Sequence, residues 1–147
     1  MRYTTTGSND RHLEIINERQ QFIGRLDHTS WFPIDKLQIT TADNIVYNID
    51  KQGFWRVKML ISRGDVTVAE ITYNWRDGFV ISFENGRKLV FRRKSIWQVN
   101  FSLVDESLQE LATIETRFKW RGFMYSYDID IPDNMLDRKQ ISYCLLY

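Results

Sequence analysis

The chain has 147 residues, 43% of them hydrophobic and 14% aromatic, which predicts one ordinary soluble domain with a single core. Its 20 basic and 19 acidic residues leave a formal charge of +1, which excludes a global field that would recruit nucleic acid. The one cysteine, Cys144, excludes an internal disulfide and the start of the chain lacks a secretory signal, so we expect a reducing, cytoplasmic setting.

Residues 1–11 are mostly small and polar, and we expect them to form a flexible tail. Short runs with strand composition follow, separated by turn residues and with no long helical pattern between them. They cover residues 12–17, 21–27, 36–41, 45–50, 55–62, 66–73, 79–83, 87–94, 97–104, 108–118 and 122–131. This spacing predicts that residues 12–147 form one all-β meander that closes as a barrel or a sandwich.

A hairpin pattern occurs twice, forty-two residues apart. The alternating apolar positions of the first copy are Trp55, Val57, Met59 and Ile61. Those of the second copy are Trp97, Val99, Phe101 and Leu103. After one extra residue, Ala69 and Ile71 correspond to Ala112 and Ile114. A period-2 pattern that repeats with its return strand predicts a duplicated β-hairpin. We expect both sets to point into one continuous core, together with Phe79, Ile81 and Phe83.

Two turns allow the register of the strands to be predicted. A three-residue loop over 84–86, with Gly86 left-handed, puts Phe83 and Leu89 on one face, whereas a two-residue Asn-Gly loop would scatter the apolar side chains. A three-residue loop over 63–65 likewise places Ile61 and Thr67 on one face. We therefore interpret the Arg-Gly-Asp tripeptide at 63–65 as hairpin chemistry and not as an adhesion signal.

The end of the chain changes character. Asp133 or Asn134 can cap a helix that begins near Met135, so residues 134–147 are predicted to be helical. The last seven residues carry no charge. A helix that is apolar around its whole circumference is expected to be buried on every side.

The repeated strand Ser95 to Glu106, its return segment Leu111 to Ile114 and the apolar C-terminal segment resemble the superfamily of tubby C-terminal domains and phospholipid scramblases. The resemblance extends over residues 12–147 in pattern. It implies a closed antiparallel barrel of about twelve strands around a central C-terminal helix. In chain order, residues 134–147 would supply that helix.

Candidates for catalysis are few, and we expect no enzyme. His12 and His28 are the only histidines, and neither lies beside a serine or cysteine nucleophile in sequence. One cysteine cannot complete a usual zinc site and no glycine-rich loop opens a helix, so no metal or cofactor is expected. Asp128 and Asp130 could supply oxygen ligands to calcium, to which scramblases respond, but outward strand carboxylates before a helix cap explain them as well.

Basic side chains are the candidates for lipid binding. They lie on two hairpins, the second of which also carries Phe118 and Trp120. These residues are Arg87, Lys88, Arg92, Arg93, Lys94, Arg117, Lys119 and Arg121. A cationic patch with aromatic residues at its edge suits anionic phospholipid headgroups. The alternative is a solvated face balanced by Glu84, Glu106 and Glu115.

Two functional hypotheses follow. The first is a non-enzymatic binding or tethering barrel that associates weakly with anionic lipids at the cytoplasmic face of a membrane, with an unidentified protein partner and no nucleic acid. Each basic residue near an anionic surface contributes only about 1 kcal/mol, so this association would be sensitive to salt. The second is a barrel whose aromatic interior holds a small apolar molecule.

Overall fold

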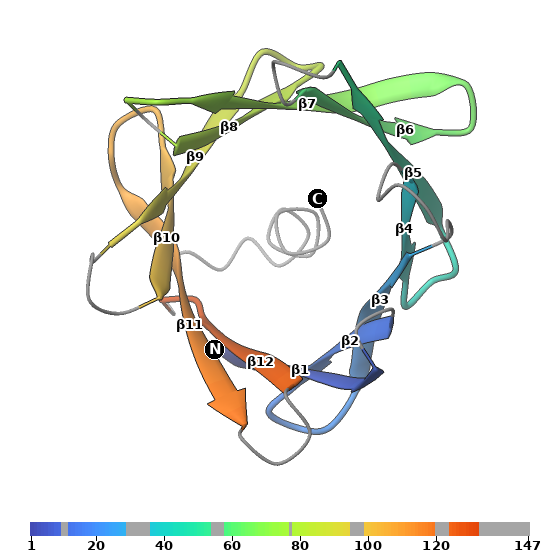
Figure 1. The fold of residues 1–147 in the computed structure, drawn as a ribbon, viewed down its shortest axis with the longest axis vertical. Helices are drawn as coiled ribbons and strands as arrows, with labels where there is room; N and C mark the ends of the chain where they lie inside the picture. Colours follow the sequence, from blue (N-terminus) through green and yellow to red (C-terminus); the bar gives the residue numbers. More distant parts are fainter. Residues whose placement is uncertain are drawn as a thin grey trace.

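The computed structural model describes residues 1–9, 12–28, 36–53, 58–76, 78–94, 99–119 and 124–132. Within them twelve antiparallel strands follow one another around a closed barrel, and the first strand pairs with the last (Figure 1). The strands are β1 (Arg2–Asn9), β2 (His12–Asn17), β3 (Phe22–His28), β4 (Lys36–Thr41), β5 (Val46–Gln52), β6 (Lys58–Arg63), β7 (Val66–Asn74), β8 (Gly78–Phe83), β9 (Lys88–Arg93), β10 (Asn100–Asp105), β11 (Glu110–Lys119) and β12 (Met124–Asp130). The predicted closed all-β barrel is confirmed, and the predicted helix over 134–147 lies outside the described residues.

Strand β1 corrects the expected N-terminal tail. Tyr3 lies opposite Asn17 of β2 and opposite Ile129 of β12, so the first strand joins the two ends of the sheet. Threonine occupies positions 4 to 6, and its branched side chain favours an extended backbone. The polar composition of this segment obscured that preference. The strand that closes the barrel is therefore the one that the sequence patterns missed.

The core lies on the inner face of the barrel. Residues opposite one another in an antiparallel pair point to the same face, and Ile61 lies opposite Ala69 while Ile81 lies opposite Leu89. The buried apolar side chains of this face are Tyr3, Ile15, Ile39, Tyr47, Ile49, Ile61, Ala69, Ile81, Leu89, Leu103, Ala112 and Ile129. They come from most of the strands around the ring, so the wall has one continuous apolar lining.

The predicted hairpin duplication is confirmed at the level of register. Ile61 lies opposite Ala69 between β6 and β7, and Leu103 lies opposite Ala112 between β10 and β11. Directly after Ile61 and directly after Leu103 the register shifts by a bulge. The two hairpins thus share their pairing and their irregularity, and they differ by the length of the turn.

Most of the described side chains that were predicted for the core lie there. Ile61, Ile81 and Leu103 are buried, and Met59 and Phe83 pack against the core.

Three of the predicted core positions, Trp55, Val57 and Trp97, lie outside the described residues. Val99 is 49% exposed, so its predicted inward position is wrong. It precedes the first residue of β10, and the alternation of that strand does not reach it.

The two predicted turns have different outcomes. At 84–86 the loop has three residues, Gly86 is left-handed with φ 84°, and the Phe83 amide donates to the Arg87 carbonyl (2.8 Å), as predicted. At 63–65 the prediction is wrong, because Arg63 pairs with Val66 and leaves a two-residue loop. Thr67 therefore lies opposite Ser62, off the core face, and the bulge that follows restores Ile61 to its place opposite Ala69.

Four described turns at one end of the barrel share a single geometry. They span residues 17–21, 41–45, 83–87 and 105–109, and in each the first amide donates to the fifth carbonyl and the fourth amide donates to the first carbonyl. The fourth residue of each turn is left-handed. These residues are Gln20 (φ 59°), Asn44 (φ 61°), Gly86 (φ 84°) and Leu108 (φ 64°).

A carboxylate holds the seam between the first and last strands. Asp128 Oδ2 accepts a hydrogen bond from Arg2 Nη2 (2.9 Å) and forms an ion pair with Arg117 Nη2 (2.6 Å), and Thr4 Oγ1 donates to Asp128 Oδ1 (3.2 Å). The Asp128 side chain is only 10% exposed. A carboxylate withdrawn from water in this way is stable only while its partners remain in place. The cluster ties β1, β11 and β12 together on the outer face.

We expect Leu89→Ala to lower the free energy of unfolding by about 2–5 kcal/mol, because the substitution removes a fully buried side chain and leaves a cavity. Val99→Ala is the control, with a change within about 0.5 kcal/mol at a half-exposed position. Urea unfolding followed by circular dichroism measures both. Equal losses in the two variants would contradict this assignment of the core.

We expect Asp128→Asn to lower the free energy of unfolding by about 1–3 kcal/mol. The substitution replaces the carboxylate between two guanidinium groups with an uncharged amide of the same shape. Asp130→Asn, at a side chain that is 73% exposed, is the matched control with a change below about 0.5 kcal/mol. Thermal unfolding at neutral pH separates them. A seam that does not depend on this cluster would leave the two variants equally stable.

Candidate functional site

A hollow of about 460 Å³ extends from the turn between β7 and β8 across β9 and β10 to Leu108 in the turn before β11. Five of its lining residues are aromatic: Tyr73, Trp75, Phe79, Phe91 and Phe101. Three are basic: Arg76, Arg92 and Arg93. The others include Gly78 and the aliphatic Val90, Val104 and Leu108. We call this site the aromatic–arginine hollow.

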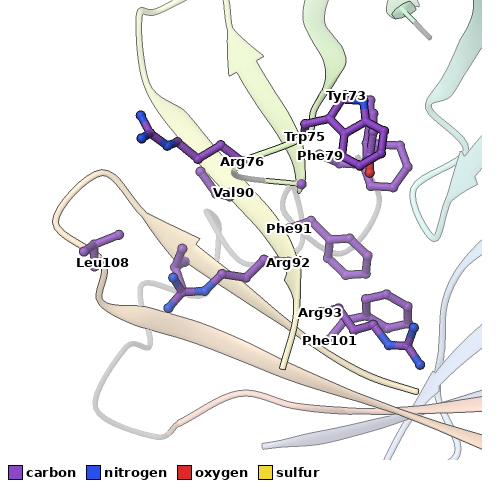
Figure 2. Close-up of a pocket in the computed structure, with 12 residues that line it drawn as sticks. Tyr73, Trp75, Arg76, Phe79, Val90, Phe91, Arg92, Arg93, Phe101 and Leu108 are labelled. Atoms are coloured by element: carbon purple, nitrogen blue, oxygen red, sulfur yellow. The ribbon is translucent and has the colours of Figure 1, made fainter. Parts of the chain in front are cut away.

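Neighbouring strands place the aromatic rings in pairs. Phe91 and Phe101 stack with ring centroids 4.8 Å apart and an interplanar angle of 15°. Tyr73 lies opposite Phe79, and their ring centroids are 5.1 Å apart. Figure 2 shows Trp75 beside this second pair, and Trp75 is 91% exposed. Aromatic pairs of this kind stabilise each other's position. The apolar side of the hollow is therefore well packed, and the Trp75 indole beside it is open to solvent.

The hollow forms where β8 begins. Gly78 has φ 91°, and a Cβ at this position would lie 2.6 Å from the carbonyl oxygen of Phe91. Glycine is therefore required for the close approach of β8 to β9. Because Phe79 lies opposite Phe91, Arg93 lies beyond the first residue of β8, at the edge of the wall.

Because side chains alternate along β9, an aromatic and a basic side chain of the hollow lie on different faces of this strand. Val90 and Arg92 point to one face of β9, and Phe91 and Arg93 point to the other. In Figure 2, Arg76 and Arg92 extend on the same side of β9 as Leu108. Within the part of the chain that the structure describes, neither Arg76 nor Arg92 forms an ion pair.

Those of the predicted basic residues that the structure describes lie at several separate places on the barrel. Arg92 and Arg93 line the hollow. Arg87 lies in the turn between β8 and β9, and Lys88 is the first residue of β9. Five residues of extended chain separate Lys88 from Arg93, which corresponds to roughly 17 Å. Arg87 and Lys88 therefore lie at the opposite end of β9 from Arg92 and Arg93.

Two other predicted basic residues form ion pairs. Lys94 Nζ lies 2.8 Å from Glu110 Oε2, and Arg117 belongs to the Asp128 cluster. The hydrogen bond from Lys94 holds the pKa of Glu110 below its usual value. Lys119 lies opposite Met124 in the β11–β12 pair, and its side chain, like Arg121 as a whole, is outside the described part of the structure.

The sequence analysis did not find Arg76 or Leu108. In the sequence, Trp75 and Arg76 lie in a polar stretch over 74–78. A large aromatic residue in a turn has no core to enter, so Trp75 could have indicated an exposed site that includes Arg76. Leu108 was interpreted as the start of a strand, and its exposure of 67% follows from its place in the turn before β11.

The structure pairs His12 with a carboxylate. His12 Nδ1 lies 2.5 Å from Asp27 Oδ1 across the β2–β3 pair, and Arg25 Nε lies 2.7 Å from Asp27 Oδ2. Sequence spacing alone could not reveal this contact, because it depends on the register of two strands. Among the described residues, no serine or cysteine is hydrogen-bonded to the pair. The arrangement is an ion pair between Arg25 and Asp27 whose carboxylate also forms a hydrogen bond with the His12 ring.

Asp128 and Asp130, the candidate calcium ligands, lie in different surroundings. The Asp128 carboxylate already forms ion pairs with two arginines and accepts a hydrogen bond from Thr4, and the Asp130 side chain is 73% exposed. A cation at Asp128 would have to displace two guanidinium groups. The described residues contain no group of three or more histidine, cysteine or acidic side chains placed to hold a metal ion.

No helix in the described segments is long and apolar enough to cross a membrane. Comparisons with models of protein families, with curated proteins and with solved structures found no match. The resemblance to tubby domains and scramblases therefore stays a prediction.

We expect Lys94→Met to raise the pKa of the Glu110 carboxyl towards its ordinary value of 4.5, because the lysine hydrogen bond is the largest cause of its lowering. An acid with a lowered pKa stabilises the fold above the pKa of the unfolded chain, and this contribution disappears as the pH falls through the folded value. Carboxyl-detected NMR titration measures the shift, with Lys88→Met as the control. An unchanged Glu110 pKa in Lys94→Met would show that the pair does not persist in solution.

Proposed function

We propose that the protein is a non-enzymatic barrel that binds anionic phospholipid at a membrane surface, transiently, through the aromatic–arginine hollow. One observation carries this proposal: Trp75 is 91% exposed in a hollow that is also lined by three arginines and by stacked phenylalanines. The proposal keeps Arg92 and Arg93 from the predicted group and adds Arg76.

The chemistry of these groups fits a phospholipid headgroup and the region below it. A guanidinium binds phosphate oxygens through two parallel hydrogen bonds and is only weakly hydrated. Tryptophan favours the boundary between water and hydrocarbon, with its ring in the apolar layer and its N–H towards water. Single-stranded nucleic acid could use similar groups, but the formal charge of +1 disfavours such a partner.

The expected affinity is low. Each basic residue near an anionic surface contributes about 1 kcal/mol, so three arginines give about 3 kcal/mol, or roughly a hundredfold enrichment at the membrane. Exposed charges are screened within about 10 Å at 0.1 M salt. The binding is therefore reversible and sensitive to salt, which suits a tether with a second, protein partner better than a permanent anchor.

The place of action follows from the lipid. Anionic phospholipids are concentrated in the cytoplasmic leaflet, so we propose a cytoplasmic protein that associates with that face. The closed barrel of twelve antiparallel strands supports the proposed relation to tubby domains and scramblases.

The second candidate, a carrier of a small apolar molecule, has less support. An apolar inner wall favours it, but Ile61 and Leu89 are 0% exposed and so offer no surface to a cargo. A molecule that stays bound in native mass spectra of the purified protein would favour the carrier.

We expect Arg76→Ala, Arg92→Ala and Arg93→Ala together to abolish the preference for anionic vesicles. Sedimentation with vesicles of phosphatidylserine and phosphatidylcholine, against pure phosphatidylcholine, measures this preference at low salt. The matched control carries Arg19→Ala, Arg63→Ala and Lys88→Ala, which remove the same charge from exposed positions outside the hollow. The control should keep most of the binding.

Two results would overturn the proposal. The first is a wild-type protein that sediments equally with anionic and neutral vesicles at low salt. The second is equal weakening by the two triple variants, because binding would then depend on total charge and not on the hollow.

A further inference from the structure

Leu108 occupies a backbone conformation that does not suit it. In the four turns of shared geometry the fourth residue is left-handed, and the other three positions hold Gln20, Asn44 and Gly86. Glycine adopts this conformation freely and asparagine does so more readily than most residues, whereas a bulky apolar side chain rarely does. Leucine is the least suitable of the four.

The turn around Leu108 is tightly held. The Leu108 amide donates to the Asp105 carbonyl (3.0 Å), and Asp105 Oδ1 accepts from the amides of Ser107 and Gln109 (2.9 Å each). Ser107 Oγ also donates to Asp105 Oδ1 (2.7 Å). These bonds fix the left-handed conformation, because strain persists only where the surrounding structure enforces it.

Folding does not account for leucine at this position. The side chain is 67% exposed, so it contributes little to the core. It lines the aromatic–arginine hollow, on the side of β9 where Arg76 and Arg92 extend (Figure 2). An exposed apolar side chain beside cationic ones is the composition that enters the headgroup and acyl boundary of an anionic bilayer.

We infer that Leu108 inserts into the bilayer as the apolar anchor of the hollow, and that the strained turn exists to present it. This inference rests on the proposed function and deepens it. Arg76 and Arg92 engage the phosphate groups, and Leu108, on the same side of β9, enters the apolar layer. Because the turn favours another residue, the same side chain lowers the stability of the fold and raises the affinity for the membrane.

The test uses Leu108→Gly in the full chain, with Gln20→Gly as the matched control in a turn of the same geometry. Leu108→Gly should raise the melting temperature and lower the partition coefficient on phosphatidylserine-containing vesicles about three- to tenfold, as expected for losing a partly inserted leucine. Gln20→Gly should also raise the melting temperature and leave the partition coefficient unchanged. Leu108→Asn, which tolerates the left-handed conformation, should reproduce the loss of binding.

The outcomes separate this inference from the proposed function. Wild-type protein without preference for anionic vesicles would overturn both. Preserved wild-type binding with an unchanged partition coefficient in Leu108→Gly and Leu108→Asn would overturn the inference alone. A lower melting temperature in Leu108→Gly would also overturn it, because the turn would then not be strained. Equal loss of binding in Gln20→Gly would overturn it as well, because the effect would come from turns in general.

Discussion

Closure of the sheet is the constraint on which the rest of the structure depends. An open sheet of twelve strands would expose two unpaired edges, and the pairing of β1 with β12 removes both. The Ile131 amide donates to the Met1 carbonyl (2.8 Å), the Tyr127 amide donates to Thr5 Oγ1 (2.7 Å), and Asp128 joins guanidinium groups from β1 and β11. Once the ring is closed each strand has a fixed register, so each side chain faces either the apolar interior or the outside.

The hollow is a consequence of this fixed register. Along β9 the alternation that buries Leu89 also sends Phe91 to the inner face and Arg92 to the outer face. Because β8 begins at Gly78, the wall beside the end of β9 is incomplete, and residues from both faces of β9 reach one opening. Apolar rings from the inner face and a guanidinium group from the outer face of β9 therefore meet at this opening. A complete strand pair would keep them on opposite faces of the sheet.

The sequence predicted what depends on local pattern, and it missed what depends on pairing across the sheet. The duplicated hairpin and the left-handed Gly86 follow from alternation and turn chemistry, and both are present. Strand β1 was missed because its polar threonines carry no alternation of apolar residues. The ion pair of Lys94, a member of the expected basic group, with Glu110 was missed for the same reason, because it depends on strand pairing that residue spacing does not reveal.

The four similar turns offer a comparison inside one molecule, in which the backbone requirement is constant and the side chain varies. A sequence selected only for folding would fill each left-handed position with glycine or asparagine, as at Gly86 and Asn44. Departures from such a rule are expected at functional sites, where another requirement outweighs local stability. Leu108 departs from it while lining a hollow that also holds Arg76 and Arg92, whereas Gln20 departs from it with a polar side chain. The position of this apolar exception beside the arginines of the hollow, rather than strain alone, is what supports the proposed contact of the turn with a membrane surface.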